Sequence, residues 1–186
     1  MTIDKETLKY VWHYTKAEYL PLIKESGALI PKSEAESNKI GARKGGAVSI
    51  VPMIWFSSNQ NWEFSAVQLA GVRWHTWQQI AAQDCAIRFG LQACDSRLLN
   101  WEESCNAAGV NREERRLRKA HVKKQRKIGS DATKWFTSLD PIPLEDLCFQ
   151  MWLDGKWTEL DSDLVINRIK ELGLSRRDTS FRLPKI

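Results

Sequence analysis

The sequence lacks the long apolar runs that mark membrane and secreted proteins. No stretch approaches the roughly 18–20 consecutive apolar residues that a helix needs to span a bilayer. Residues 1–10 are polar and mixed, without the apolar segment of a signal peptide. Internal repeats and low-complexity tracts are also absent. We therefore expect a soluble cytoplasmic protein that folds as one domain over residues 1–186 and does not contact a membrane.

Cysteine and histidine are scarce and poorly spaced for metal binding. The four cysteines, Cys85, Cys94, Cys105 and Cys148, form no CxxC pair, and the three histidines lie far from them in the sequence. Structural zinc sites are usually built from closely spaced pairs of such ligands. We therefore expect no metal site and reduced thiols in a cytosolic setting.

Tryptophan and basic residues are what the chain has in quantity. Its nine Trp residues each offer a flat face and one N–H donor, which suits a core as well as a pocket for a planar ligand. A hydrophobic content of 42% predicts a globular fold, and the net charge of +5 mildly favours an anionic partner.

The periodicity of the chain predicts an α+β fold. Thr15 is expected to N-cap a helix, with Glu18 completing a capping box, and Gly27 to C-cap that helix. Asp154-Gly155 is typical of a hairpin turn. Strand patterns cover 9–14, 48–57, 85–91, 134–139, 147–153 and 156–160. Helix patterns cover 16–26, 62–69, 95–108 and 162–172. We expect residues 32–47 to form a long loop and residues 174–186 to form a loosely held basic tail.

Two short aromatic segments contain polar groups that suit a ligand site. In the strand Trp12-His13-Tyr14-Thr15, the His13 side chain is expected on the opposite face of the strand from Trp12 and Tyr14. Its imidazole could then face a pocket. The second segment, residues 54–59, ends an aromatic strand with Ser57 and is followed by Glu63. Each of these polar groups also has a purely structural explanation. His13 would be a hydrogen-bonded core histidine, and Ser57 would belong to a turn at a strand end. Glu63 would be a carboxylate that interacts favourably with a helix dipole.

In this order, the segments resemble the opening of ADP-ribosyltransferase-fold proteins, in particular the DarT-like and RNA 2′-phosphotransferase-like groups. The resemblance rests on scattered pieces within residues 9–160: Trp12-His13-Tyr14-Thr15, the helix that ends in residues 26–31, the aromatic strand 54–58 and the strand-turn 149–157. It implies an α+β ADP-ribosyltransferase-like split β-sandwich with flanking helices.

The same resemblance implies NAD as cofactor, bound in a cleft between two small sheets. His13 would hold the adenosine ribose with Thr15 beside it, while the rings of Tyr14, Trp55 or Phe56 would pack against nicotinamide. Ser57 would support the strand that forms the cleft. A glutamate would bond the nicotinamide ribose and stabilise the oxocarbenium-like transition state as nicotinamide leaves.

The position that aligns with the catalytic glutamate holds Gln150 instead. An amide cannot stabilise a cation as a carboxylate does, and such a loss typically costs about 10²–10³ in rate. Three explanations stay open: another carboxylate serves, the chain binds NAD without turnover, or Gln150 is an engineered inactivation. The candidate catalytic residues are Gln150 and Glu63, with Glu145 and Glu159 as further carboxylates.

A strongly basic stretch is the second functional indication. Its nine basic residues, which we predict to contact nucleic acid, are Arg112, Arg115, Arg116, Arg118, Lys119, Lys123, Lys124, Arg126 and Lys127. With few apolar residues, the stretch cannot bury a broad face, so it is either a solvated helix or a phosphate-binding surface with strong salt dependence.

We therefore expect an enzyme that transfers ADP-ribose from NAD to a nucleic acid or protein acceptor. The alternative is a non-enzymatic nucleic-acid-binding or inhibitor protein that uses residues 112–127. A third possibility, NAD-dependent RNA 2′-phosphate transfer, would need further contacts to phosphate, for which Arg88 is the candidate.

Overall fold

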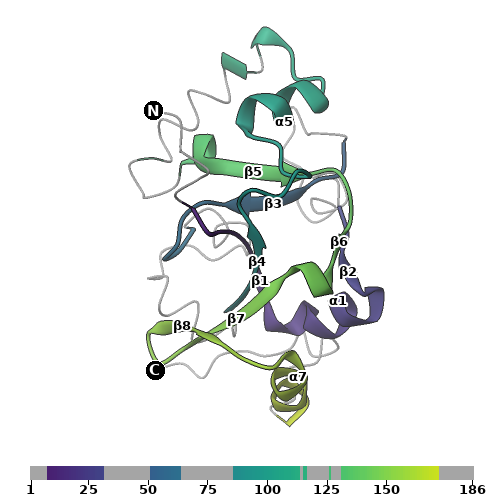
Figure 1. Cartoon of the computed structure of the whole chain (residues 1–186), viewed down its shortest axis with the longest axis vertical. Helices are drawn as coiled ribbons and strands as arrows, with labels where there is room; N and C mark the ends of the chain where they lie inside the picture. Colours follow the sequence, from purple (N-terminus) through teal and green to yellow (C-terminus); the bar gives the residue numbers. More distant parts are fainter. Residues whose placement is uncertain are drawn as a thin grey trace, which may run out of the picture.

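The computed structural model describes residues 8–31, 51–63, 86–113, 115–116, 126 and 131–171. Their strands form a six-stranded antiparallel sheet in the order β5-β3-β1-β4-β7-β8 and a small two-stranded sheet, β2-β6 (Figure 1). The predicted α+β class is confirmed at this level. The strands are β1 (Tyr10–Lys16), β2 (Ala28–Leu29), β3 (Ile54–Ser57), β4 (Ala86–Gln92), β5 (Trp135–Ser138), β6 (Ile142–Pro143), β7 (Cys148–Leu153) and β8 (Lys156–Glu159).

Short helices connect and flank these strands. They are η2 (Ala17–Tyr19), α1 (Leu20–Ser26), α5 (Trp101–Ala107), η4 (Ala132–Lys134), η5 (Leu144–Asp146) and α7 (Ser162–Glu171), where η denotes a 3₁₀ helix. Gly27 ends α1 at φ 67°, as predicted for a C-cap, because glycine adopts the left-handed conformation without strain.

The predicted N-cap role of Thr15 is wrong. Thr15 stays in β1, where it lies opposite Ile87 of β4, and α1 begins only at Leu20 after the η2 turn. The helix expected from residue 95 begins at Trp101, because Asn100 and Glu103 form a capping box there. Of the helix predicted over 62–69, residues 62 and 63 are not helical and the rest lies outside the described residues. The predicted loop 32–47 and the predicted tail 174–186 also lie outside them.

The six-stranded sheet divides where β1 meets β3. Seven residue pairs join β1 to β4, and four join β3 to β5, but only Trp12 and Ser57 pair β1 with β3. Figure 1 shows β3 and β5 running across the direction of β4 and β7. The sheet therefore consists of a β5-β3 part and a β1-β4-β7-β8 part, and we call their meeting point the β1–β3 junction.

The two faces of the larger part differ in character. One face carries the hydrophobic core, in which Val11, Ile87 and Phe89 pack with Leu20 of α1 and Val165 of α7. The opposite face carries a smaller cluster of Trp62 and Ala86, against which the rings of Tyr14, Trp152 and Trp157 pack. Polar side chains lie among these rings on the second face, and they form part of the candidate site.

Candidate functional site

Four polar residues lie side by side across four neighbouring strands. Tyr14 of β1 pairs with Arg88 of β4, Arg88 with Gln150 of β7, and Gln150 with Glu159 of β8. Paired residues of antiparallel strands point to the same face of the sheet. We call these four residues the polar row.

Arg88 is the most buried member of the polar row, with 5% of its surface exposed. Its Nε and Nη2 donate to Oε1 of Gln150 at 2.9 and 2.6 Å, and its Nη1 donates to the carbonyl of Gln60 at 2.7 Å. The guanidinium carbon lies 3.7 Å from the ring centre of Trp12 and 4.3 Å from that of Trp157. Burial lowers the pKa of Arg88, and the Tyr14 hydroxyl acts in the opposite direction.

The acceptors around Arg88 are neutral. Among the described residues, Arg88 forms no ion pair, unlike Lys24, Arg97 and Arg126. Arg88 is therefore a buried cation held by amide and carbonyl oxygens and by the faces of two indoles. Such cation–π contacts contribute about 0.5–2 kcal/mol, more where water is excluded.

Gly90 makes room for the indole beneath Arg88. A Cβ at this position would lie 2.7 Å from a ring carbon of Trp12 and 2.6 Å from Sγ of Cys148. Glycine at this point therefore lets the Trp12 ring lie flat against β4. Gln60 fixes the other end of the ring, since its Oε1 accepts from Trp12 Nε1 at 3.0 Å.

Tyr14 lies at the β1 end of the row. Its hydroxyl donates to the carbonyl of Asn59 at 2.8 Å, and its ring contacts Trp62 and Trp157 edge-on. Burial raises the pKa of Tyr14 from 10.0 to about 12, while Arg88 counteracts this shift. Tyr14 is therefore a neutral hydrogen-bond donor throughout the neutral pH range.

A second buried polar pair lies at the end of β3. Ser57 and Glu63 are 4% and 5% exposed, and Ser57 Oγ donates to Oε2 of Glu63 at 2.7 Å. The turn between them is held by Asn59, whose Oδ1 accepts from the backbone N–H groups of residues 61 and 62 at 3.1 and 3.2 Å. This turn brings the Glu63 carboxylate back to the strand end.

His13 lies on the opposite face of β1 from Tyr14. Its Nδ1 donates to the carbonyl of Trp55 at 2.9 Å, because a carbonyl only accepts, and its ring contacts Phe56 edge-on. Thr15 and Phe56 share this core-side face by strand alternation, whereas Tyr14 and Ser57 share the other. The six predicted cofactor residues thus gather at the β1–β3 junction but are divided between two faces.

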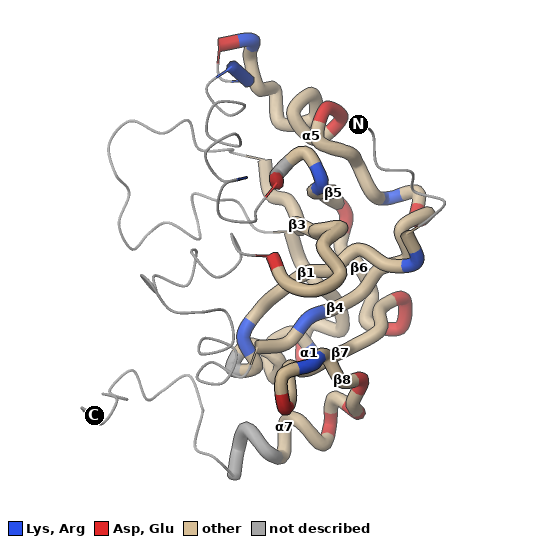
Figure 2. The backbone as a smooth tube through the Cα atoms, turned by 90° about the vertical axis from the view of Figure 1, so that its left-hand side faces the viewer, with Lys and Arg blue, Asp and Glu red and all other residues tan. Residues whose placement is uncertain are grey.

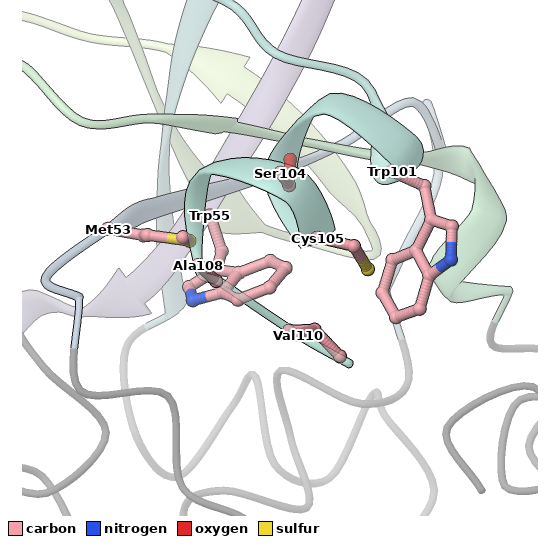
Figure 3. A pocket seen from close by; sticks show the side chains of 7 residues that line it. All are labelled: Met53, Trp55, Trp101, Ser104, Cys105, Ala108 and Val110. Atoms are coloured by element: carbon pink, nitrogen blue, oxygen red, sulfur yellow. The ribbon is translucent and has the colours of Figure 1, made fainter. Parts of the chain in front are cut away.

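Trp55 lies on the same face of β3 as Ser57 by strand alternation, and it lines a pocket beside α5. The pocket walls are Met53, Trp55, Trp101, Ser104, Cys105, Ala108 and Val110, and Figure 3 shows the Trp55 indole among them. The walls are mostly apolar. The polar groups of Ser104 are already engaged, because its Oγ contacts the Thr137 hydroxyl at 2.6 Å.

The predicted carboxylates occupy different places. Glu63 is bonded to Ser57, Glu159 is exposed at the end of the polar row, and Glu145 is exposed in η5, outside the row. Gln150 lies in the row, but its amide oxygen is taken by Arg88.

The basic stretch is described at four of its nine predicted residues. Arg115 donates to the Val110 carbonyl and to Asn106, and Arg126 pairs with Asp131, so these two fasten neighbouring turns. Arg112 and Arg116 are exposed. Arg118, Lys119, Lys123, Lys124 and Lys127 lie outside the described residues. Figure 2 shows the described Lys and Arg residues at separate places along the chain.

Sequence patterns indicate Arg88 only weakly, and they do not indicate the roles of Gln60, Asn59 and Trp157. The signal for Arg88 was a lone arginine inside an apolar strand. The other three act through a turn and through cross-strand contacts, which a single sequence does not reveal. Trp157, for example, donates from Nε1 to the Asn61 carbonyl and so holds the turn over Arg88.

Within the described part of the chain, no helix is long and apolar enough to cross a bilayer. The His, Cys, Asp and Glu residues of that part form no group of three or more that could hold a metal ion. Comparisons of the chain with protein-family models, with curated proteins and with solved structures found no match.

Proposed function

We propose that this chain is an ADP-ribosyltransferase-like protein that binds NAD at the β1–β3 junction and transfers ADP-ribose from it. The proposal includes the specific fold, a split β-sandwich whose two sheets are the β5-β3 and β1-β4-β7-β8 parts. The single residue pair between β1 and β3 supports this division. The hydrogen bond from His13 to the Trp55 carbonyl lies at the same place.

The observation that carries the proposal is the Ser57–Glu63 pair. Burying a carboxylate is costly unless it is hydrogen-bonded, so a fold that keeps one beside a strand end gains something from its charge. Glu63 supplies the carboxylate that the resemblance requires and that Gln150 does not. We therefore assign the catalytic role to Glu63.

The groups near the junction suit each part of NAD. Aromatic rings such as Tyr14 match a planar base, and His13 matches a ribose hydroxyl. NAD, when bound, supplies the ADP-ribosyl group and nicotinamide as the leaving group. Glu63 would stabilise the positive charge that develops on the ribose, and Ser57 would hold the carboxylate in place. The acceptor is a nucleic acid or a protein, with the exposed Arg112 and Arg116 available to contact it.

The test is incubation with labelled NAD and either mixed nucleic acid or a cell lysate. We expect label transfer by the natural chain, lowered about 10²–10³-fold in Glu63→Gln, because an oriented carboxylate typically contributes that much. Glu159→Gln is the matched control, since it removes a carboxylate from the same face, and it should stay within a few-fold of the natural chain. A chain that neither binds NAD in calorimetry nor transfers label would contradict the proposal.

A further inference from the structure

We propose that Arg88 is an anion-binding subsite for the phosphate groups of a nucleotide, and that Gln150 preserves the positive charge of this subsite. The inference deepens the proposed function, on which it rests for the identity of the nucleotide, because NAD carries a diphosphate. Its chemistry concerns binding alone and involves no covalent step.

Arg88 is paired with the neutral amide of Gln150 and not with a carboxylate. Two guanidinium nitrogens converge on one side-chain oxygen of Gln150, which is the geometry that a carboxylate would also satisfy. A glutamate has nearly the same shape and would neutralise Arg88. For a purely structural arginine, a carboxylate partner would be the better choice, because a buried cation is costly without one. The amide holds the guanidinium in place and leaves its charge for a ligand.

Two indole rings hold the guanidinium of Arg88 in place. Trp12 and Trp157 contact it through their rings, so its plane is fixed without the use of an N–H donor. The remaining edge, at Nη1, donates to the backbone carbonyl of Gln60, whose residue is exposed. A phosphate oxygen would replace this carbonyl, because a charged acceptor bonds a guanidinium more strongly than a neutral one.

The charges near the subsite fix its expected preferences. Tyr14 is neutral and contributes a hydroxyl. Two carboxylates are near the polar row: the buried Glu63, which acts electrostatically on Tyr14, and the exposed Glu159, which lies next to Gln150. Glu159 would repel an anion weakly through solvent. We therefore expect Glu159→Gln to leave phosphate affinity unchanged or to raise it by up to a few-fold, which is opposite in sign to the effect at Gln150.

The decisive variant is Gln150→Glu, measured in the full chain by titration calorimetry with pyrophosphate, inorganic phosphate and NAD as separate probes. We expect pyrophosphate to bind the natural chain and to bind Gln150→Glu at least about tenfold more weakly, since the new carboxylate neutralises Arg88. Gln92→Glu is the matched control, because it adds the same charge at an exposed position of β4, and it should bind as the natural chain does. Should Gln150→Glu fail to fold, Arg88→Met tests the same charge and should lose pyrophosphate binding.

The outcomes separate this inference from the proposed function. Failure of pyrophosphate to bind the natural chain, or equal binding by Gln150→Glu or Arg88→Met, would overturn the anion subsite. If Gln150 instead occupied the catalytic position, Gln150→Glu would raise label transfer and leave pyrophosphate binding unchanged, which would also overturn it. Pyrophosphate binding that depends on Arg88, in a chain that does not bind NAD, would support the subsite and contradict the proposed function.

Discussion

Single residues of the site are fixed by partners from distant parts of the sequence. Arg88 is one apolar-strand arginine in the sequence, yet its environment is built from Trp12, Gln60, Gln150 and Trp157. Strand alternation predicted correctly that His13 and Tyr14 face opposite ways, as their contacts show. It could not predict which face would be the core, because that depends on which face α1 and α7 cover.

Tyr14 gives a prediction for stability at alkaline pH. Its pKa is raised from 10.0 to about 12, so the folded state holds the proton more tightly than the unfolded state. The resulting stabilisation is complete below pH 10 and is lost as the pH rises from 10 to 12. Tyr14→Phe cannot ionise, so the stability advantage of the natural chain over this variant should shrink across that interval.

Urea unfolding of both proteins at a series of pH values between 8 and 12 measures this difference. At pH 8, Tyr14→Phe should be less stable by about 1 kcal/mol, because it lacks the bond to the Asn59 carbonyl. Tyr10→Phe removes a hydroxyl from the same strand and serves as the control. A stability difference between Tyr14→Phe and the natural chain that is constant from pH 8 to 12 would show that Tyr14 is not protected from ionisation.

At the scale of elements, local sequence signals predicted the end of a helix and the turn of a hairpin correctly. Gly27 ends α1, and Asp154-Gly155 turns the β7–β8 hairpin with positive φ at both residues, as predicted. Local sequence signals failed where pairing between strands determined the secondary structure. Thr15 has the chemistry of an N-cap, but the seven-residue ladder between β1 and β4 keeps it in a strand.

The turn 58–63 is an element whose order depends on one side chain. Asn59 Oδ1 accepts from the N–H groups of residues 61 and 62, and this turn positions Glu63. Asn59→Ala should lower the free energy of unfolding by about 1–2 kcal/mol, because it leaves backbone donors without their acceptor. Hydrogen exchange should become faster at the amides of residues 61 and 62.

Asn61→Ala provides the comparison for this variant, because it shortens an exposed asparagine in the same turn without removing that acceptor. Under the proposed function, Asn59→Ala should also reduce label transfer, since Glu63 would no longer be held at Ser57. Unchanged exchange at residues 61 and 62 would mean that the turn is ordered by other contacts, such as the bond from Trp157 to the Asn61 carbonyl.

For the whole molecule, the α+β class followed from the order of strand and helix patterns, but the division of the sheet did not. Strand patterns do not specify how many residues pair, and here β1 and β3 share a single pair. The two parts of the sheet therefore depend on side chains that bridge them. His13 is one such bridge, because its imidazole from β1 bonds the backbone of β3.

His13→Ala should loosen the β1–β3 junction rather than the whole fold. We expect a loss of about 1–2 kcal/mol of stability, from the lost hydrogen bond and ring contact. Hydrogen exchange should rise in β3 and β5 while β7 and β8 keep their protection, because the larger part of the sheet retains its ladders. Thr15→Ala should not produce this pattern, because Thr15 lies on the same face of β1 but has no side-chain hydrogen bond to β3 within the described residues. An equal increase over all six strands would show that the sheet opens as one unit.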